Sequence, residues 1–127
     1  MNVGKEFERG KIITESILEF AEKVYFIPHK LFRGVSLKLL VSGSKTNNAL
    51  SLHLVHIEPQ CCLERHIHPD NLEIHKVISG GGTFEIGSNS GEYREGTVGV
   101  ISRGIMHKVT AGENGLHILA TFSPALV

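Results

Sequence analysis

Glycine spacing in the second half of the chain constrains the fold more than any other sequence feature. Glycine recurs at short intervals from Gly80 to Gly115, whereas a helical repeat of apolar residues occurs only near the start of the chain. Short apolar segments separated by turn-forming residues are typical of antiparallel strands, which assemble into sandwiches, jelly rolls or barrels. The sequence therefore predicts an all-β fold with six or more strands.

The boundaries of the expected elements follow from the same pattern. A short helix is expected over residues 14–22, because Thr14 can act as its cap and Pro28 stops any helix beyond it. Strands are expected near Val35–Val41, Ala49–Ile57, Leu72–Ser79, Thr83–Gly87, Val98–Ser102, His107–Thr110 and His117–Phe122. Turns are expected at residues 42–48, 69–71, 80–82, 87–92 and 112–115.

Length and charge limit the possible organisation and partners. The 127 residues are the size of one domain, with residues 1–32 expected as an N-terminal arm and residues 33–127 as the barrel. Thirteen basic and thirteen acidic residues balance, and no basic cluster is present that would bind nucleic acid or an anionic membrane. No apolar run reaches the ~20 residues that span a bilayer. We expect a homodimer, since small symmetric oligomers are common and the arm offers apolar residues.

The two cysteines bear on the cellular compartment. Cys61 and Cys62 are adjacent, so they cannot link distant segments of the chain. They are interpreted as reduced thiols, and we expect a cytoplasmic protein.

Histidine and glutamate placement suggests a metal site. His66 and His68 are two residues apart, so on a strand their side chains leave the same face. The Pro69-Asp70-Asn71 turn would bring the next strand back alongside, with Glu73 near both imidazoles. His107, after a glycine-bearing turn, could reach the same cavity. Such nitrogen and oxygen ligands suit a divalent transition metal, namely Fe, Mn, Ni, Co or Zn.

Two motifs built on these residues resemble those of a known family. The stretch from His66 to Gly80 reads HxHxxxxExxxxxxG, and the stretch from Gly96 to His107 reads GxxxxxSxGxxH. Both are similar to the two cupin motifs, and the chain resembles a small single-domain cupin. The resemblance implies a double-stranded β-helix, also called a jelly-roll barrel of the RmlC-like kind, in which His66, His68, Glu73 and His107 ligate one metal ion. Three positions depart from the family pattern, none of them a ligand: Gln60 in place of Gly, Ser102 in place of Pro, and Ala111 in place of Asn.

Three further residues have open roles. His75 should share the face of Glu73, as a group supporting the ligands or a catalytic base, or else as a hydrogen-bonded structural histidine. His53 could point into the barrel, but the apolar residues on both faces of its strand leave this undecided. Cys62 would face the metal only if its strand has no bulge.

Two classes of function fit these features. The first is an enzyme that acts on a small molecule, either dioxygenase-like or a Lewis-acid isomerase, decarboxylase or lyase. The alternative is a barrel that binds or senses a small ligand without turnover. The sequence leaves the metal and the substrate open.

Overall fold

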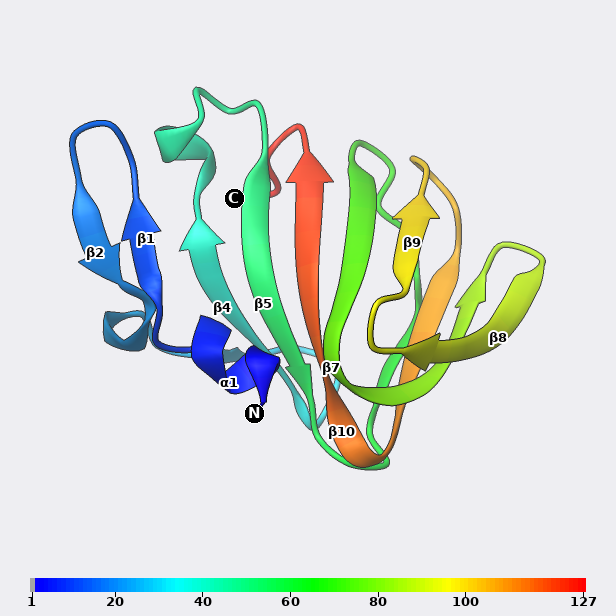
Figure 1. Cartoon of the computed structure of the whole chain (residues 1–127). Coiled ribbons are helices and arrows are strands. Elements are labelled where there is room, and N and C mark those ends of the chain that lie inside the picture. The colour runs from blue at the N-terminus through cyan, green and yellow to red at the C-terminus, as the bar shows by residue number, and fades with distance from the viewer. Residues whose placement is uncertain (1) are drawn as a thin grey trace.

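Strands dominate the fold (Figure 1). The computed structural model describes residues 2–127. In chain order the elements are α1 (Val3–Phe7), β1 (Lys11–Ile13), β2 (Leu18–Phe20), the 3₁₀ turn η1 (Ala21–Lys23), β3 (Ile27–Pro28), β4 (Val35–Val41), the 3₁₀ turn η2 (Gly43–Lys45), β5 (Ser51–Ile57), β6 (Cys62–His66), β7 (Leu72–Ile86), β8 (Asn89–Arg94), β9 (Val98–Ile101) and β10 (His107–Ser123).

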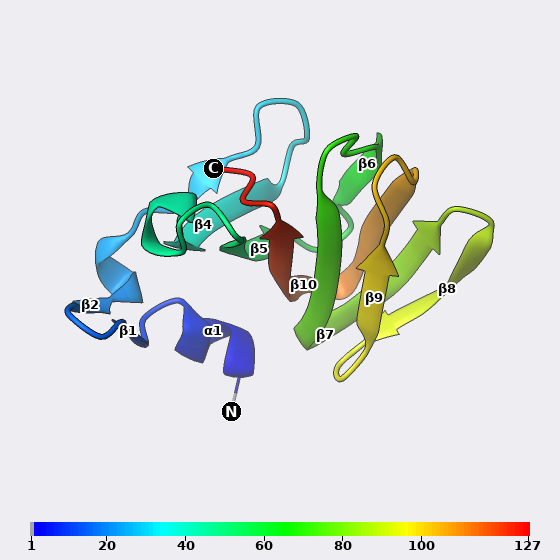
Figure 2. The ribbon, with the colours of Figure 1, turned by 90° about the horizontal axis from the view of Figure 1, so that it is seen from above.

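The two longest strands, β7 and β10, belong to both layers of a barrel. One half of each joins a layer with the order β3-β4-β5-β10-β7-β9, and the other half joins β6-β10-β7-β8. Figure 1 shows both strands bending at the bottom of the view, and Figure 2 shows the two layers from above. The all-β barrel expected from the sequence is confirmed.

The sequence predicted that the glycines at residues 80–82 would end a strand, but β7 continues through them. Residues 72–79 and 83–87 were predicted as separate strands, but one strand passes through the three glycines. A Cβ on Gly80 would collide with the carbonyl oxygen of Gly115, and one on Gly82 with that of Thr110. These glycines therefore allow the backbones of β7 and β10 to approach closely while both bend. The two strands predicted at residues 107–110 and 117–122 likewise form the single strand β10.

The turn predicted at residues 87–92 is also shorter than expected. Ile86 pairs with Asn89, so only Gly87 and Ser88 connect β7 to β8. Gly87 has a φ of 57°, which two-residue hairpin loops commonly require. The polar residues that follow form the strand β8 rather than a loop.

The helix predicted over residues 14–22 is wrong. The Thr14 hydroxyl accepts hydrogen bonds from the backbone N–H of Ser16 and of Ile17. These bonds close a tight loop between β1 and β2, in which Ile13 pairs with Leu18. A threonine that can cap a helix can equally close a turn, and pairing across the hairpin decided the outcome. The helix of the arm is instead α1.

Apolar residues pack on both faces of the layer that contains β5. Val55 and Ile57 belong to the cluster inside the barrel, whereas Leu54 belongs to a second cluster on the outer face under the N-terminal arm. The ammonium group of buried Lys38 donates to the Ala21 carbonyl at 3.0 Å and thereby ties the arm to the sheet. Burial on both faces explains why the apolar pattern of β5 did not identify its inward side.

Among residues 2–127, no helix is long and apolar enough to cross a membrane.

Candidate metal centre

Four predicted ligand residues meet inside the barrel. His66 is the last residue of β6, His68 follows two residues later, Glu73 is the second residue of β7, and His107 is the first of β10. One potential ligand atom from each lies within 4.8 Å of all the others. The group could therefore hold a metal ion. His68 lies beyond the end of β6. Among the described residues β6 pairs with β10 and not with β7, so the strand pair expected on either side of the Pro69-Asp70-Asn71 turn is wrong.

Sheet pairing and turn hydrogen bonds hold the three histidines. His66 pairs directly with His107 across β6 and β10, and their ring centroids are 4.0 Å apart. The backbone N–H of Gly104 donates to the carbonyl of His68 at 3.0 Å. This bond ties the loop after β6 to the turn before β10, so that residues distant in sequence face one point.

Backbone carbonyls set the protonation of two of the rings. His66 Nδ1 lies 2.7 Å from the carbonyl oxygen of Glu64, and His107 Nδ1 lies 3.0 Å from that of Ile105. Because a carbonyl oxygen can only accept a hydrogen bond, each Nδ1 carries the ring proton and acts as the donor. In the neutral rings, the Nε2 lone pair is then free to bind a metal.

Glu73 faces these rings as a buried carboxylate. It is 3 % exposed, and its Oε2 accepts a hydrogen bond from His75 Nε2 at 2.8 Å. Burial raises its pKa, but His75, which donates a hydrogen bond to its carboxylate, helps to lower that pKa well below the ordinary value for a glutamate. Glu73 is therefore charged near neutral pH.

The second oxygen of Glu73 supplies a test of whether a metal fits. Glu73 Oε1 and His107 Nε2 are 3.1 Å apart, yet both are buried without a hydrogen-bond partner among the described residues. With the His107 proton on Nδ1, two acceptor lone pairs face each other, and such an arrangement is costly in a buried site. A cation bound between them would satisfy both atoms, so these residues fit a metal ion.

The pKa values of the ligand histidines favour neutral rings. Burial, together with the nearby His107 and His68, lowers the pKa of His66 to about 4, although the carbonyl of Glu64 opposes this shift. Burial likewise lowers the pKa of His68. Neutral imidazole is the form that binds metals, so both rings are ready to ligate at neutral pH.

His75 lies behind Glu73 and is 1 % exposed. Its Nδ1 is 2.9 Å from the hydroxyl of Tyr93, which is also 1 % exposed. Burial and the charge of Glu73 raise the pKa of Tyr93, so its hydroxyl stays protonated and donates a hydrogen bond to His75 Nδ1. The resulting chain runs from Tyr93 through His75 to Glu73 Oε2. Sequence reasoning placed His75 on the face of Glu73 but missed Tyr93, because no strand was expected between the turn at residues 87–92 and Val98.

A cavity of about 80 Å³ lies beside the ligand group. His53 lines it together with His66, His68 and Glu73, so the side chain of His53 points into the barrel. Its ring packs edge-on against Phe122 at a centroid distance of 5.3 Å. The remaining lining residues are His29, Leu37, Val55, Leu63, Phe122 and Leu126.

A bulge in β6 turns Cys62 away from the ligands. Leu63 pairs with Val109 while His66 pairs with His107, so β6 contains one residue more than β10 over this interval. The extra residue reverses the alternation of side chains. Leu63 therefore lines the cavity, and the Cys62 thiol contacts the Thr110 hydroxyl at 3.4 Å.

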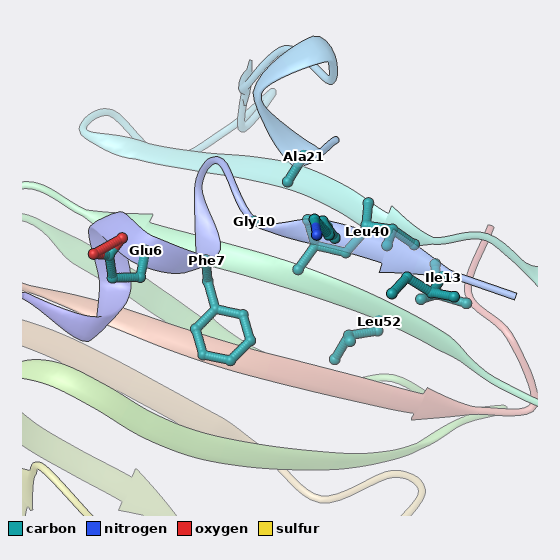
Figure 3. Close-up of a pocket in the computed structure, with 10 residues that line it drawn as sticks. Glu6, Phe7, Gly10, Ile13, Ala21, Leu40 and Leu52 are labelled. Atoms are coloured by element: carbon teal, nitrogen blue, oxygen red, sulfur yellow. The ribbon is translucent and has the colours of Figure 1, made fainter. Parts of the chain in front are cut away.

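A larger cavity of about 340 Å³ lies elsewhere, between the N-terminal arm and the outer face of β4 and β5 (Figure 3). Phe7, Ile13, Leu40 and Leu52 are among its mostly apolar lining residues. It includes none of the four clustered ligand residues. We therefore assign the candidate site to the smaller cavity, where the ligand atoms converge.

Comparisons with known proteins identify the fold. Neither a scan against protein families nor a search of curated proteins found a match. Among solved structures, a predicted oxalate decarboxylase from Thermotoga maritima superposes with a TM-score of 0.74 at 20 % identity, covering 81 % of this chain and 95 % of that one. KdgF from a Halomonas species gives 0.71 at 18 %, covering 81 % and 90 %. An RmlC-like cupin from Shewanella frigidimarina gives 0.73 at 17 %, covering 89 % and 94 %. Together with the barrel topology, these similarities show that the chain has the cupin fold.

Proposed function

We propose that this protein is a metal-dependent enzyme that acts on a small oxygen-containing molecule, with His66, His68, Glu73 and His107 holding one divalent transition metal ion. The buried, unpartnered pair of Glu73 Oε1 and His107 Nε2 carries this proposal. Buried polar atoms in proteins almost always have partners, so a pair without them points to a bound group.

The donor set narrows the chemistry. Three imidazole nitrogens and one carboxylate oxygen suit Fe(II), Mn, Ni, Co or Zn and leave up to two positions for another molecule. A bound ion would polarise a carbonyl or carboxylate oxygen or, if it is Fe(II), support reaction with dioxygen. Decarboxylation, isomerisation, lyase reactions and oxidative cleavage all fit this description, and the neighbour from Thermotoga maritima is itself a predicted oxalate decarboxylase.

Residues around the ligands have three tasks in this proposal. His75 and Tyr93 fix the orientation of Glu73 through their hydrogen bonds, so we assign His75 as a positioning residue. The apolar side chains of the cavity limit the entry of water. His53 offers a polar group to the bound molecule.

Metal analysis tests the proposal directly. Elemental mass spectrometry of the parent protein, grown without added metal, should find nearly one transition metal ion per chain. His66→Ala and Glu73→Ala should each lose it. His56→Ala serves as the control, because this histidine lies outside the ligand group and should leave the metal content unchanged. An absence of metal in the parent, even after reconstitution, would refute the proposal.

Turnover is tested separately. Oxygen uptake and product analysis with small diketones, flavonols and thiols should reveal a reaction that stops in Glu73→Ala. A metal-loaded protein that turns over nothing across a broad panel would instead fit a barrel that binds or senses a ligand.

We also propose a homodimer, supported by apolar residues that the β1–β2 hairpin exposes. Ile13 is 66 % exposed and Leu18 is 54 % exposed. A two-stranded hairpin is only marginally stable alone, so covering these residues would stabilise it. Sedimentation at working concentration should give a dimer, and a clean monomer would refute this proposal.

A further inference from the structure

The cavity beside the candidate metal centre contains no cationic side chain among its lining residues. Apart from Glu73, those residues are histidines and apolar side chains. Its volume of about 80 Å³ is far below the ~300–1,000 Å³ of pockets that take drug-sized molecules. The cavity therefore suits a molecule of only a few non-hydrogen atoms.

Charge balance then limits which small molecules can bind. A divalent ion and the Glu73 carboxylate together carry one net positive charge, since the histidine ligands are neutral. A ligand with one negative charge makes the site neutral, whereas a dianion leaves one negative charge with no Lys or Arg in the lining to compensate it. An uncompensated charge in a buried site is strongly unfavourable.

His53 supplies the hydrogen-bond donor for such a ligand. Its Nε2 lies 3.3 Å from the hydroxyl oxygen of Ser51, which is fully buried and already accepts the backbone N–H of Leu126 at 2.9 Å. The Ser51 hydroxyl can donate its proton to His53 Nε2, and in that tautomer the ring proton is on Nδ1. Within the part of the chain that the structure describes, this Nδ1 has no hydrogen-bond partner, and the ring is 4 % exposed.

We propose that the cavity binds a small monoanion with two adjacent oxygens, of the 2-oxo or 2-hydroxy carboxylate class, and that His53 donates to one of those oxygens. This inference rests on the proposed function, because the metal ion supplies the positive charge. The apolar end of the molecule would lie against Leu63 and Phe122, which form part of the wall.

Three ligands with equal numbers of non-hydrogen atoms separate charge from size: pyruvate is a monoanion, oxalate is a dianion, and 2,3-butanedione is neutral. Their affinities are measured by isothermal titration calorimetry on protein loaded with Mn(II), and for comparison on the free ion in the same buffer. Oxalate binds free ions more strongly than pyruvate does. In the protein we expect the ratio of oxalate affinity to pyruvate affinity to be about tenfold or more lower than for the free ion. We expect no detectable binding of 2,3-butanedione.

Variants of His53 test the donor. His53→Leu should weaken pyruvate binding by about tenfold, the effect of losing one hydrogen bond to a charged group. His53→Gln, which keeps a donor, should restore part of that loss. His56→Leu is a matched control, because His56 lies on the same strand but does not line the cavity. Mn(II) content is measured for every variant and should be unchanged.

The outcomes distinguish the two proposals. A protein that binds no Mn(II) overturns both. A protein that binds Mn(II) but keeps the full aqueous preference for oxalate, or whose His53→Leu variant binds pyruvate as the parent does, overturns only this inference.

Discussion

Replacing Tyr93 with Phe removes one oxygen atom from the barrel interior and leaves the aromatic ring in place. The ring belongs to the main apolar cluster and packs near Phe84 at a centroid distance of 5.1 Å. Most of the packing of residue 93 should therefore survive the substitution. The loss is confined to the hydrogen bond of 2.9 Å to His75 Nδ1.

The expected effect follows from the burial of both partners. Tyr93 and His75 are each 1 % exposed, so water cannot replace the lost hydroxyl. A buried acceptor left without a partner costs about 1–3 kcal/mol of unfolding free energy. Because His75 also orients Glu73, metal affinity should fall by about 10–100-fold, as for other groups that support metal ligands.

Urea denaturation of the metal-free protein measures the first effect, and competition with a metal chelator measures the second. Tyr25→Phe is a matched control, since Tyr25 is 84 % exposed and should change neither quantity. Unaltered stability and unaltered metal affinity in Tyr93→Phe would refute the claim that this chain of hydrogen bonds holds Glu73.

Three further predictions follow from individual residues. Metal-free protein should lose about 1–2 kcal/mol of stability through His66 as the pH falls from 6.5 to about 4, discounting for its partial exposure. The sign follows because a lowered folded-state pKa means that, as the pH falls, the unfolded chain takes up the proton first. Urea titrations at several pH values should show that the unfolding free energy depends less on pH in His66→Gln than in the parent. An equal pH dependence in the two proteins would contradict this. Gln60 has a φ of 66°, so Gln60→Gly should raise the unfolding free energy by about 0.5 kcal/mol, the relief of strain exceeding the added chain entropy; a lower value would contradict the strain argument. A Cβ on Gly4 would collide with the His117 ring and the Ser79 hydroxyl, so Gly4→Ala should detach α1 and increase hydrogen exchange there, which an unchanged exchange pattern would disprove.

Local sequence spacing identified the ligand group because its geometry is largely local. His66, His68 and Glu73 lie on either side of the short connection from β6 to β7, which keeps them near one another although β6 pairs with β10 and not with β7. His107 was found because it follows a glycine-bearing turn at the start of a strand. The same local information failed for residues 14–22, where a cap residue fits a helix and a hairpin equally well.

Features that depend on pairing between distant strands could not be predicted. The bulge that turns Cys62 away from the cavity exists only because β6 pairs with β10. Tyr93 supports Glu73 through a hydrogen bond from its hydroxyl to the ring of His75, and these two residues are 18 apart in sequence.

The sequence by itself determined the all-β class and which side chains form the candidate metal site, since both depend on residue type and short-range spacing. Only the tertiary structure decided which ring nitrogens face a backbone carbonyl, which histidine faces the cavity and which side chains line it. These properties arise from contacts between segments brought together by folding. One example is the Ser51 hydroxyl, which accepts a hydrogen bond from the backbone N–H of Leu126 and contacts His53 Nε2. No periodicity along the chain encodes such contacts, because each depends on the register and bending of strands that are far apart in sequence.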